Sequence, residues 1–232
     1  MTGWLPPDAW EAVALSLRVA LVAVLASLPL GLFTAYALAR WRFPGKQIVN
    51  GLVHLPLILP PVVTGYLLLL TFGRMGWLGA PLSSLGITLA FRWTGAALAA
   101  GVMAFPLMVR AIRLAIEAVD PGLEEAAATL GASRARIFAT ITLPLILPGV
   151  VAGAVIAFAK AMGEFGATIT FVSNIPGQTQ TLPSAIYSFL QVPGGEATVA
   201  RLVLVAVVIA MAALVASEWL ARRVAARIRG ER

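Results

Sequence analysis

The feature that most constrains this chain is a series of long apolar runs that contain no charged side chain. About 20 helical residues cross a hydrocarbon core of about 30 Å, and such runs are typical of membrane spans. The longest extends from Gln47 to Gly73. The others are Val19 to Ala39, within a helix expected at Trp10 to Arg40; Trp93 to Val109, with a helix continuing to about Ile116; Ile137 to Ala159; and Leu202 to Ser217. The sequence therefore predicts an all-α bundle of five transmembrane helices.

The composition agrees with a membrane protein. Apolar residues make up 60% of the 232 residues and charged residues 12%, whereas soluble domains are nearer to half and a quarter. These values exclude a single soluble domain, and the high hydrophobicity excludes a disordered chain. The chain has no Cys and one His. This removes disulfides, Fe–S clusters and thiolate metal sites, argues against a metal site built on histidines, and predicts no cofactor in this chain.

The net charge of +7 is unevenly distributed along the chain. Twelve Lys and Arg residues lie in the loop after the first run, in the segment between the third and fourth runs and in the C-terminal tail, against three in the other connections. The positive-inside rule then predicts an inner-membrane protein with its N-terminus outside and its C-terminus in the cytoplasm. This distribution of charge argues against a basic surface that binds nucleic acid. The only charges before Arg18 are Asp8 and Glu11, so the first run is predicted to be a retained span rather than a signal peptide.

Three prolines interrupt the second run. Pro56, Pro60 and Pro61 each remove a backbone donor inside the membrane, so this span is predicted to be kinked or broken. Two interpretations stay open: a bend that packs against neighbouring helices, or a bend that lines a solute path, as discontinuous helices do in transporters. His54 precedes the bend. It is interpreted as an interhelical hydrogen-bond partner rather than a proton relay, because no acidic chain accompanies it.

The segment 117–140 is the longest predicted cytoplasmic stretch. Asp120 is a good N-cap, Pro121 suits the first helical position and Gly131 can end a helix in the left-handed conformation. A short helix is therefore expected from Pro121 to Leu130. Ser133 is positioned to cap a second helix that leads into the fourth span.

The short helix carries an apolar stripe with the spacing i, i+3, i+4 and i+7, formed by Leu123, Ala126, Ala127 and Leu130. A stripe this narrow fits a groove on a partner protein. The alternative is a helix lying flat on the lipid surface. Glu124 and Glu125 suit an anionic leaflet poorly, so docking on a protein partner is favoured.

These residues also carry a resemblance. The chain matches the pattern EAA-x3-G-x9-I-x-L-P of permease subunits of bacterial ABC importers at Glu125, Ala126, Ala127, Gly131, Ile141, Leu143 and Pro144. The resemblance implies that this loop is the coupling helix, which sits in a cleft of a separate ATP-hydrolysing subunit. ATP and Mg would then bind to that subunit and not to this chain.

The resemblance continues along nearly the whole chain, from about Asp8 to Arg223. The stretch from Phe43 to Lys46, the second span, Phe105 to Ala115 and Gly163 to Tyr187 look like those of molybdate-type permeases, which are close to sulfate permeases. This likeness implies a single permease domain over residues 1–232 that works as a homodimer. It also implies two ATP-binding cassette subunits, an external oxyanion-binding protein, and a tetrahedral oxyanion as substrate: molybdate, tungstate or sulfate.

Motifs of enzymes are missing. Gly45-Lys46 is followed by Gln47 and lacks the upstream glycine of a phosphate-binding loop, so the chain is not predicted to hydrolyse ATP. The alternative function is a self-contained secondary anion transporter, which normally carries ionisable groups at the midplane and internal repeats. Lys160 and Glu164 are the only such candidates besides His54, and they are predicted near the outer face. A scaffold that transports nothing is a third, weaker hypothesis.

The candidate solute path or outer gate combines the prolines of the second span with the stretch Gly163 to Asn174, which is predicted to be the most polar part of the fourth span and its outer exit. Its candidate residues are Pro60, Pro61, Glu164, Thr168, Thr170 and Ser173. Neutral hydroxyl donors would bind a passing dianion weakly enough to release it, whereas Glu164 is expected to pair with Lys160 or to meet the docked binding protein. In the alternative interpretation, these small and hydroxyl residues pack two copies together across a dimer axis.

Overall fold

Helices account for all regular secondary structure in the computed structural model, which describes residues 4–228. In chain order they are α1 Pro7–Arg40, α2 Lys46–Ile58, α3 Pro61–Phe72, α4 Gly79–Ser84, α5 Trp93–Glu117, α6 Pro121–Thr129, α7 Arg134–Ile137, the π-helical turn η1 Phe138–Thr142, α8 Leu143–Met162, α9 Gly166–Val172, α10 Leu182–Leu190 and α11 Glu196–Ile228. The predicted all-α class is confirmed.

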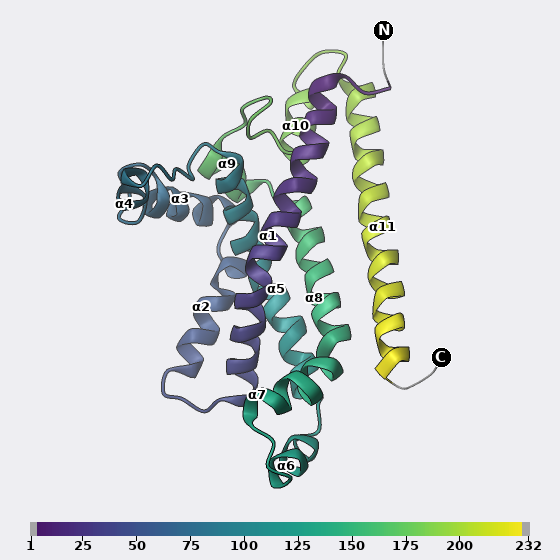
Figure 1. The fold of residues 1–232 in the computed structure, drawn as a ribbon. Helices are drawn as coiled ribbons and strands as arrows, with labels where there is room; N and C mark the ends of the chain where they lie inside the picture. Colours follow the sequence, from purple (N-terminus) through teal and green to yellow (C-terminus); the bar gives the residue numbers. More distant parts are fainter. Residues whose placement is uncertain (1–3, 229–232) are drawn as a thin grey trace.

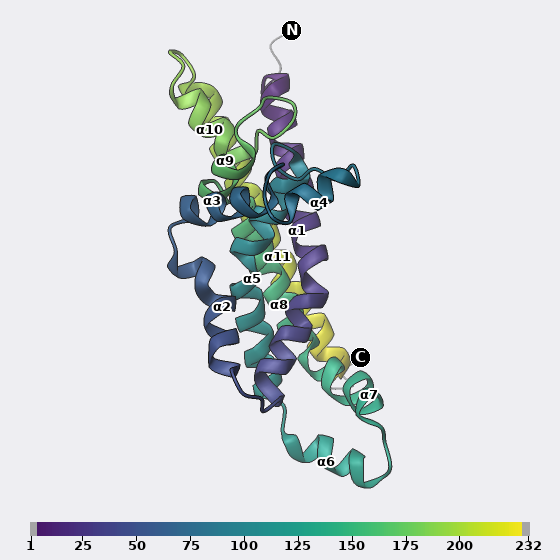
Figure 2. The same cartoon turned by 90° about the vertical axis from the view of Figure 1, so that its left-hand side faces the viewer.

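The long helices α1, α5, α8 and α11 run side by side and define two ends of the molecule (Figure 1). We call them the α6 end, where α6 and α7 lie with the last turn of α1, and the α10 end, where α1 begins. Figure 2 shows α3 and α4 lying across the bundle rather than along it. The start of α1 and the described end of α11 therefore lie at opposite ends of the bundle.

The core is built around α5, which is the most enclosed of the long helices. Small side chains line its contacts: Ala96, Ala99 and Ala100 are buried there. On α8, a Cβ added to Gly153 would lie 3.2 Å from the carbonyl oxygen of Met108, so the two backbones approach closely. Small residues permit such contact between membrane helices, where apolar burial alone gives little drive to associate.

Four predicted spans are confirmed as continuous helices long and apolar enough to cross a membrane. The fifth is the pair α2 and α3, between which the direction of the helix bends by 115°. The predicted break is therefore confirmed, but the run Gln47 to Gly73 does not form one straight span. The cause is local: Pro60 is extended, with φ −54° and ψ 135°, and Pro61 has no N–H to continue the ladder of α2.

The fourth span extends further at both ends than the sequence predicts. It is helical from Arg134 to Met162 through α7, η1 and α8. The polar stretch Gly163 to Asn174 is not its continuation, because the chain breaks at Gly163 and begins the separate helix α9. The helices α4 and α10 were not predicted either.

Two polar side chains within the spans find local partners. His54 Nδ1 lies 2.8 Å from the carbonyl oxygen of Asn50, and because a carbonyl only accepts, this nitrogen donates. The prediction of an interhelical partner for His54 is therefore wrong, since the acceptor belongs to its own helix. The guanidinium of Arg18 stacks on the ring of Trp93 at 3.8 Å, which partly compensates the cost of a cation in the span.

Candidate functional site

The short helix α6 is formed by the caps that the sequence predicts. The side chain of Asp120 accepts a hydrogen bond of 2.9 Å from the N–H of Gly122. At the other end Gly131 has φ +82°. The N–H of Gly131 donates to Ala128 and that of Ala132 to Ala127, which is the Schellman arrangement. The helix ends at Thr129, with Leu130 as its C-cap, so it is one residue shorter than predicted.

The surface of α6 is almost entirely uncovered by the rest of the chain. The helix has no buried residue, and Figure 2 shows it at the tip of the molecule. Leu123 is 49% exposed and Leu130 88%, although leucine is among the residues most often buried. Glu125 is exposed as well. The predicted apolar stripe therefore has little cover within this chain, as a helix that docks on a partner requires.

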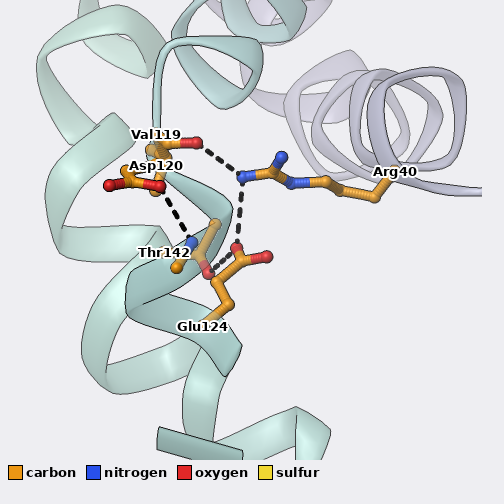
Figure 3. A network of polar contacts seen from close by, with 6 residues as sticks. Arg40, Val119, Asp120, Glu124 and Thr142 are labelled. Carbon is orange, nitrogen blue, oxygen red and sulfur yellow. Dashed lines mark hydrogen bonds and ion pairs between the residues drawn. The ribbon is translucent and has the colours of Figure 1, made fainter. Parts of the chain in front are cut away.

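One polar network attaches α6 to the bundle (Figure 3). Arg40, the last residue of α1, donates from Nη2 to the carbonyl oxygen of Val119 at 3.0 Å and lies 3.5 Å from Glu124 Oε1. Thr142 Oγ1 donates to the same carboxylate oxygen at 2.7 Å. The three contacts join residues 18, 79 and 84 positions apart, and rules of local spacing do not predict contacts between residues so distant in sequence.

The second half of the matched pattern lies away from α6. Ser133 caps α7 by accepting from the N–H of Arg136 at 3.4 Å, which confirms the predicted second helix. Ile141 lies in the π-helical turn η1, and Leu143 and Pro144 form the first turn of α8. The pattern therefore covers the exposed helix α6 and the partly buried base of the span that it leads into.

A second candidate site lies where α3 crosses α9. A Cβ added to Gly166 would meet Pro61 Cβ at 2.7 Å, and one added to Gly65 would meet the carbonyl oxygen of Ala167 at 2.5 Å. The structure thus brings the prolines of the bend and the polar segment of the predicted solute path into direct contact. Pro60 and Pro61 themselves are exposed.

Glu164 stabilises this crossing from within the chain. Its side chain is 1% exposed, and Lys160 Nζ donates to its Oε2 at 2.7 Å. Its other oxygen accepts from the N–H of Ala167 at 3.0 Å, near the positive end of α9. The predicted pairing with Lys160 is confirmed. Both carboxylate oxygens accept hydrogen bonds from this chain, so Glu164 has a structural role at the crossing.

The three hydroxyl residues of the predicted path differ in their surroundings. Thr168 is buried, and Thr170 Oγ1 donates to the carbonyl oxygen of Gly166 in its own helix at 2.9 Å. Ser173 is half-buried and has φ +67° and ψ −167°. Residues other than glycine rarely adopt this conformation, which costs about 1–3 kcal/mol and recurs at functional sites. Within residues 4–228 neither the hydroxyl of Ser173 nor that of Thr168 makes a hydrogen bond. Ser173 is the less buried of the two, so its hydroxyl is the most available donor of the three.

The sequence matches a known protein family over most of its length. Residues 27–230 match the model of the family described as binding-protein-dependent transport system inner membrane component. The chain belongs to this family. It is therefore a transport component of the inner membrane, with several membrane-spanning helices.

Relatives in this family share much of the sequence. The molybdenum transport system permease protein ModB of Escherichia coli is 61% identical over 214 residues, which cover 92% of this chain and 93% of the relative. ModB of Haemophilus influenzae is 56% identical over the same shares. A sulfate transport system permease protein of Synechococcus elongatus is 40% identical over 75% of this chain and 60% of its own length. The resemblance to molybdate-type and sulfate permeases is confirmed.

Solved structures of ABC transporters have the same fold. A bacterial ABC transporter involved in the import of the acidic polysaccharide alginate superimposes with a TM-score of 0.75 at 18% identity, covering 94% of this chain and 80% of that one. The methionine ABC transporter MetNI gives a TM-score of 0.67 at 17% identity and covers 94% of both chains. Identities this low establish a shared membrane fold and no more.

Proposed function

We propose that this chain is the permease subunit of an ATP-driven ABC importer for a tetrahedral oxyanion, most directly molybdate. The observation that carries the proposal is the 61% identity to a molybdenum permease over 92% of the chain. The alternative, a self-contained secondary anion transporter, has no use for an exposed docking helix. The uncovered stripe of α6 supports the importer instead.

The proposed assembly contains two copies of this chain, two ATP-binding cassette subunits and an external oxyanion-binding protein. The cassette subunits, which bind ATP and Mg, would receive α6 at the cytoplasmic face. A second copy would cover apolar surface that α2 leaves open, since this helix has no buried residue and Ile58 at its end is 77% exposed. Lipid would surround the outer faces of α1 and α11.

Copurification tests this assembly. The chain is coexpressed with the cassette ATPase of the same transport system, purified in detergent and mixed with the binding protein loaded with molybdate. We expect the ATPase to copurify with the chain and its hydrolysis to rise when the loaded binding protein is added. A chain that purifies without an ATPase, or hydrolysis indifferent to the loaded binding protein, would contradict the proposal.

The proposed orientation places the α6 end in the cytoplasm. Arg42, Lys46, Arg134 and Arg136 belong to this end of the bundle, whereas Arg201 at the α10 end donates to the carbonyl oxygen of Trp4. Two of the basic tail residues, Arg229 and Arg232, lie outside the described residues. The asymmetry supports an external N-terminus and a cytoplasmic C-terminus.

A fusion experiment tests the orientation. We expect alkaline phosphatase joined after Arg223 to be inactive and a fluorescent protein joined there to be bright, because each reports one side of the membrane. A second fusion, placed in the loop between α10 and α11, should give the opposite pair of results. Active phosphatase after Arg223 would mean that the orientation is wrong.

We further propose that the solute path runs past α9, with Ser173 as its main hydroxyl donor and Thr168 and Thr170 beside it. A hydrogen bond to a charged group contributes about 1.5–3 kcal/mol. Ser173→Gly removes the hydroxyl and tolerates the positive φ, so we expect oxyanion uptake to slow about tenfold. Ser84→Ala is the control, since that exposed hydroxyl lies in α4, outside the proposed path, and donates to the carbonyl oxygen of Pro81. Uptake at the wild-type rate in Ser173→Gly would leave these residues with a packing role only.

A further inference from the structure

Two adjacent glutamates of α6 have different surroundings. Glu125 is exposed, as expected of a residue that meets a partner subunit. The side chain of Glu124 is only 19% exposed and points back toward its own bundle. Figure 3 shows its carboxylate between Arg40 and Thr142. The two carboxylates therefore face different molecules in the proposed importer.

The contacts of Glu124 join three separate parts of the chain. Arg40 ends α1, Glu124 lies in α6, and Thr142 ends the turn η1 at the base of α8. Thr142 is completely buried and donates to Glu124 at 2.7 Å. The same arginine nitrogen that faces Glu124 also holds the carbonyl oxygen of Val119, just before α6 begins. Because α6 has no buried residue, this network is its main side-chain attachment to the spans.

We propose that Arg40, Glu124 and Thr142 form a positioning latch that transmits displacement of α6 to the bases of α1 and α8. The inference rests on the proposed function, because it assumes that α6 docks on an ATPase subunit. Energetic coupling between distant sites needs contacts that link rigid elements, and α8 is such an element. It ends at Met162. In its last turn Lys160 pairs with Glu164, which accepts from the N–H of Ala167 in α9 where that helix crosses α3. A shift at Thr142 thus reaches the bend through one helix of 20 residues.

The contact between Arg40 and Glu124 can become shorter and gain a second hydrogen bond. The distance from Arg40 Nη2 to Glu124 Oε1 is 3.5 Å, which is longer than the usual 2.7–2.9 Å of a charge-assisted hydrogen bond. Arg40 Nε is buried and makes no hydrogen bond among the residues that the structure describes. Buried donors normally have partners. A small displacement of α6 would bring the second carboxylate oxygen of Glu124 toward this free donor.

The test separates transmission from docking by measuring two rates in the same vesicles. The importer is reconstituted with its ATPase and binding protein, and ATP hydrolysis and molybdate uptake are measured together. We expect Glu124→Gln and Thr142→Val to hydrolyse ATP within about twofold of the wild type while uptake per ATP falls about tenfold, a typical coupling between sites. The losses in the double variant Glu124→Gln with Thr142→Val should be less than additive, because the two side chains share one contact.

Two matched controls define the expected pattern. Glu218→Gln removes an exposed carboxylate paired with Arg222 on α11 and should leave uptake per ATP unchanged. Glu125→Gln, on the exposed side of α6, should lower the stimulated hydrolysis itself. Wild-type uptake per ATP in both Glu124→Gln and Thr142→Val would overturn the latch, as would loss of ATPase copurification in Glu124→Gln. Wild-type vesicles without ATP-dependent uptake would instead contradict the proposed function.

Discussion

Gly131→Val is expected to abolish transport while leaving the spans folded and inserted. Gly131 has φ +82°, and a Cβ placed there would meet no atom within 4 Å. The effect therefore comes from the backbone alone, at a cost of about 1–2 kcal/mol that grows for a β-branched residue. α6 has nine residues and none is buried, so packing cannot hold the helix end in place. A cost of this size lowers the population of the native conformation at the end of α6 by a factor of roughly 5–30.

Gly131→Asn is the matched control, because asparagine tolerates the left-handed conformation. Molybdate uptake by cells that express either variant provides the measurement, with the amount of chain in the membrane determined by immunoblot. We expect Gly131→Asn to retain most uptake and Gly131→Val to lose it at equal expression. Equal uptake in both variants would show that the conformation of the α6 cap does not matter for coupling.

Gly65→Ala is expected to displace α3 from α9. The added Cβ would lie 2.5 Å from the carbonyl oxygen and 2.9 Å from the Cα of Ala167, and backbone atoms cannot move aside as a flexible side chain does. Overpacking of this kind costs about 1–3 kcal/mol. For a chain of this size the unfolding midpoint in detergent should fall by roughly 2–12 °C. Uptake should fall as well, since the crossing lies at the proposed path.

Gly51→Ala provides the control on the neighbouring helix. A Cβ at Gly51 of α2 would meet nothing within 4 Å, and alanine is favoured over glycine in a helix by about 0.5–1 kcal/mol. This variant should melt at or slightly above the wild-type temperature. If Gly65→Ala also melts at or above the wild-type temperature, α3 and α9 do not approach each other as closely as described.

Local sequence signals predicted the elements that depend on neighbours along the chain. Apolar runs located the long helices, and Asp120, Pro121 and Gly131 located α6 to within one residue. The prolines of the second run predicted its break. Each of these features depends on contacts within a few positions, which is the range over which spacing and capping rules apply.

Features that depend on distant contacts were not predicted. The direction of α3 after the break is set by its packing on α9, about 100 positions later in the chain. The attachment of Glu124 requires Arg40 and Thr142, which no spacing rule connects. The separation of α9 from α8 was not predicted either, although Gly163 and Gly166 are a signal for it and the local pairing of Glu164 with Lys160 was predicted.

The energy source of uptake distinguishes an ATP-driven importer from a secondary transporter. Vesicles that contain this chain with its ATPase subunits receive the oxyanion-binding protein outside, and radioactive molybdate uptake is measured with ATP trapped inside or with a proton or sodium gradient and no ATP. We expect uptake only when both ATP and the binding protein are present. Uptake by this chain alone, driven by an ion gradient without ATP, would contradict the proposed function.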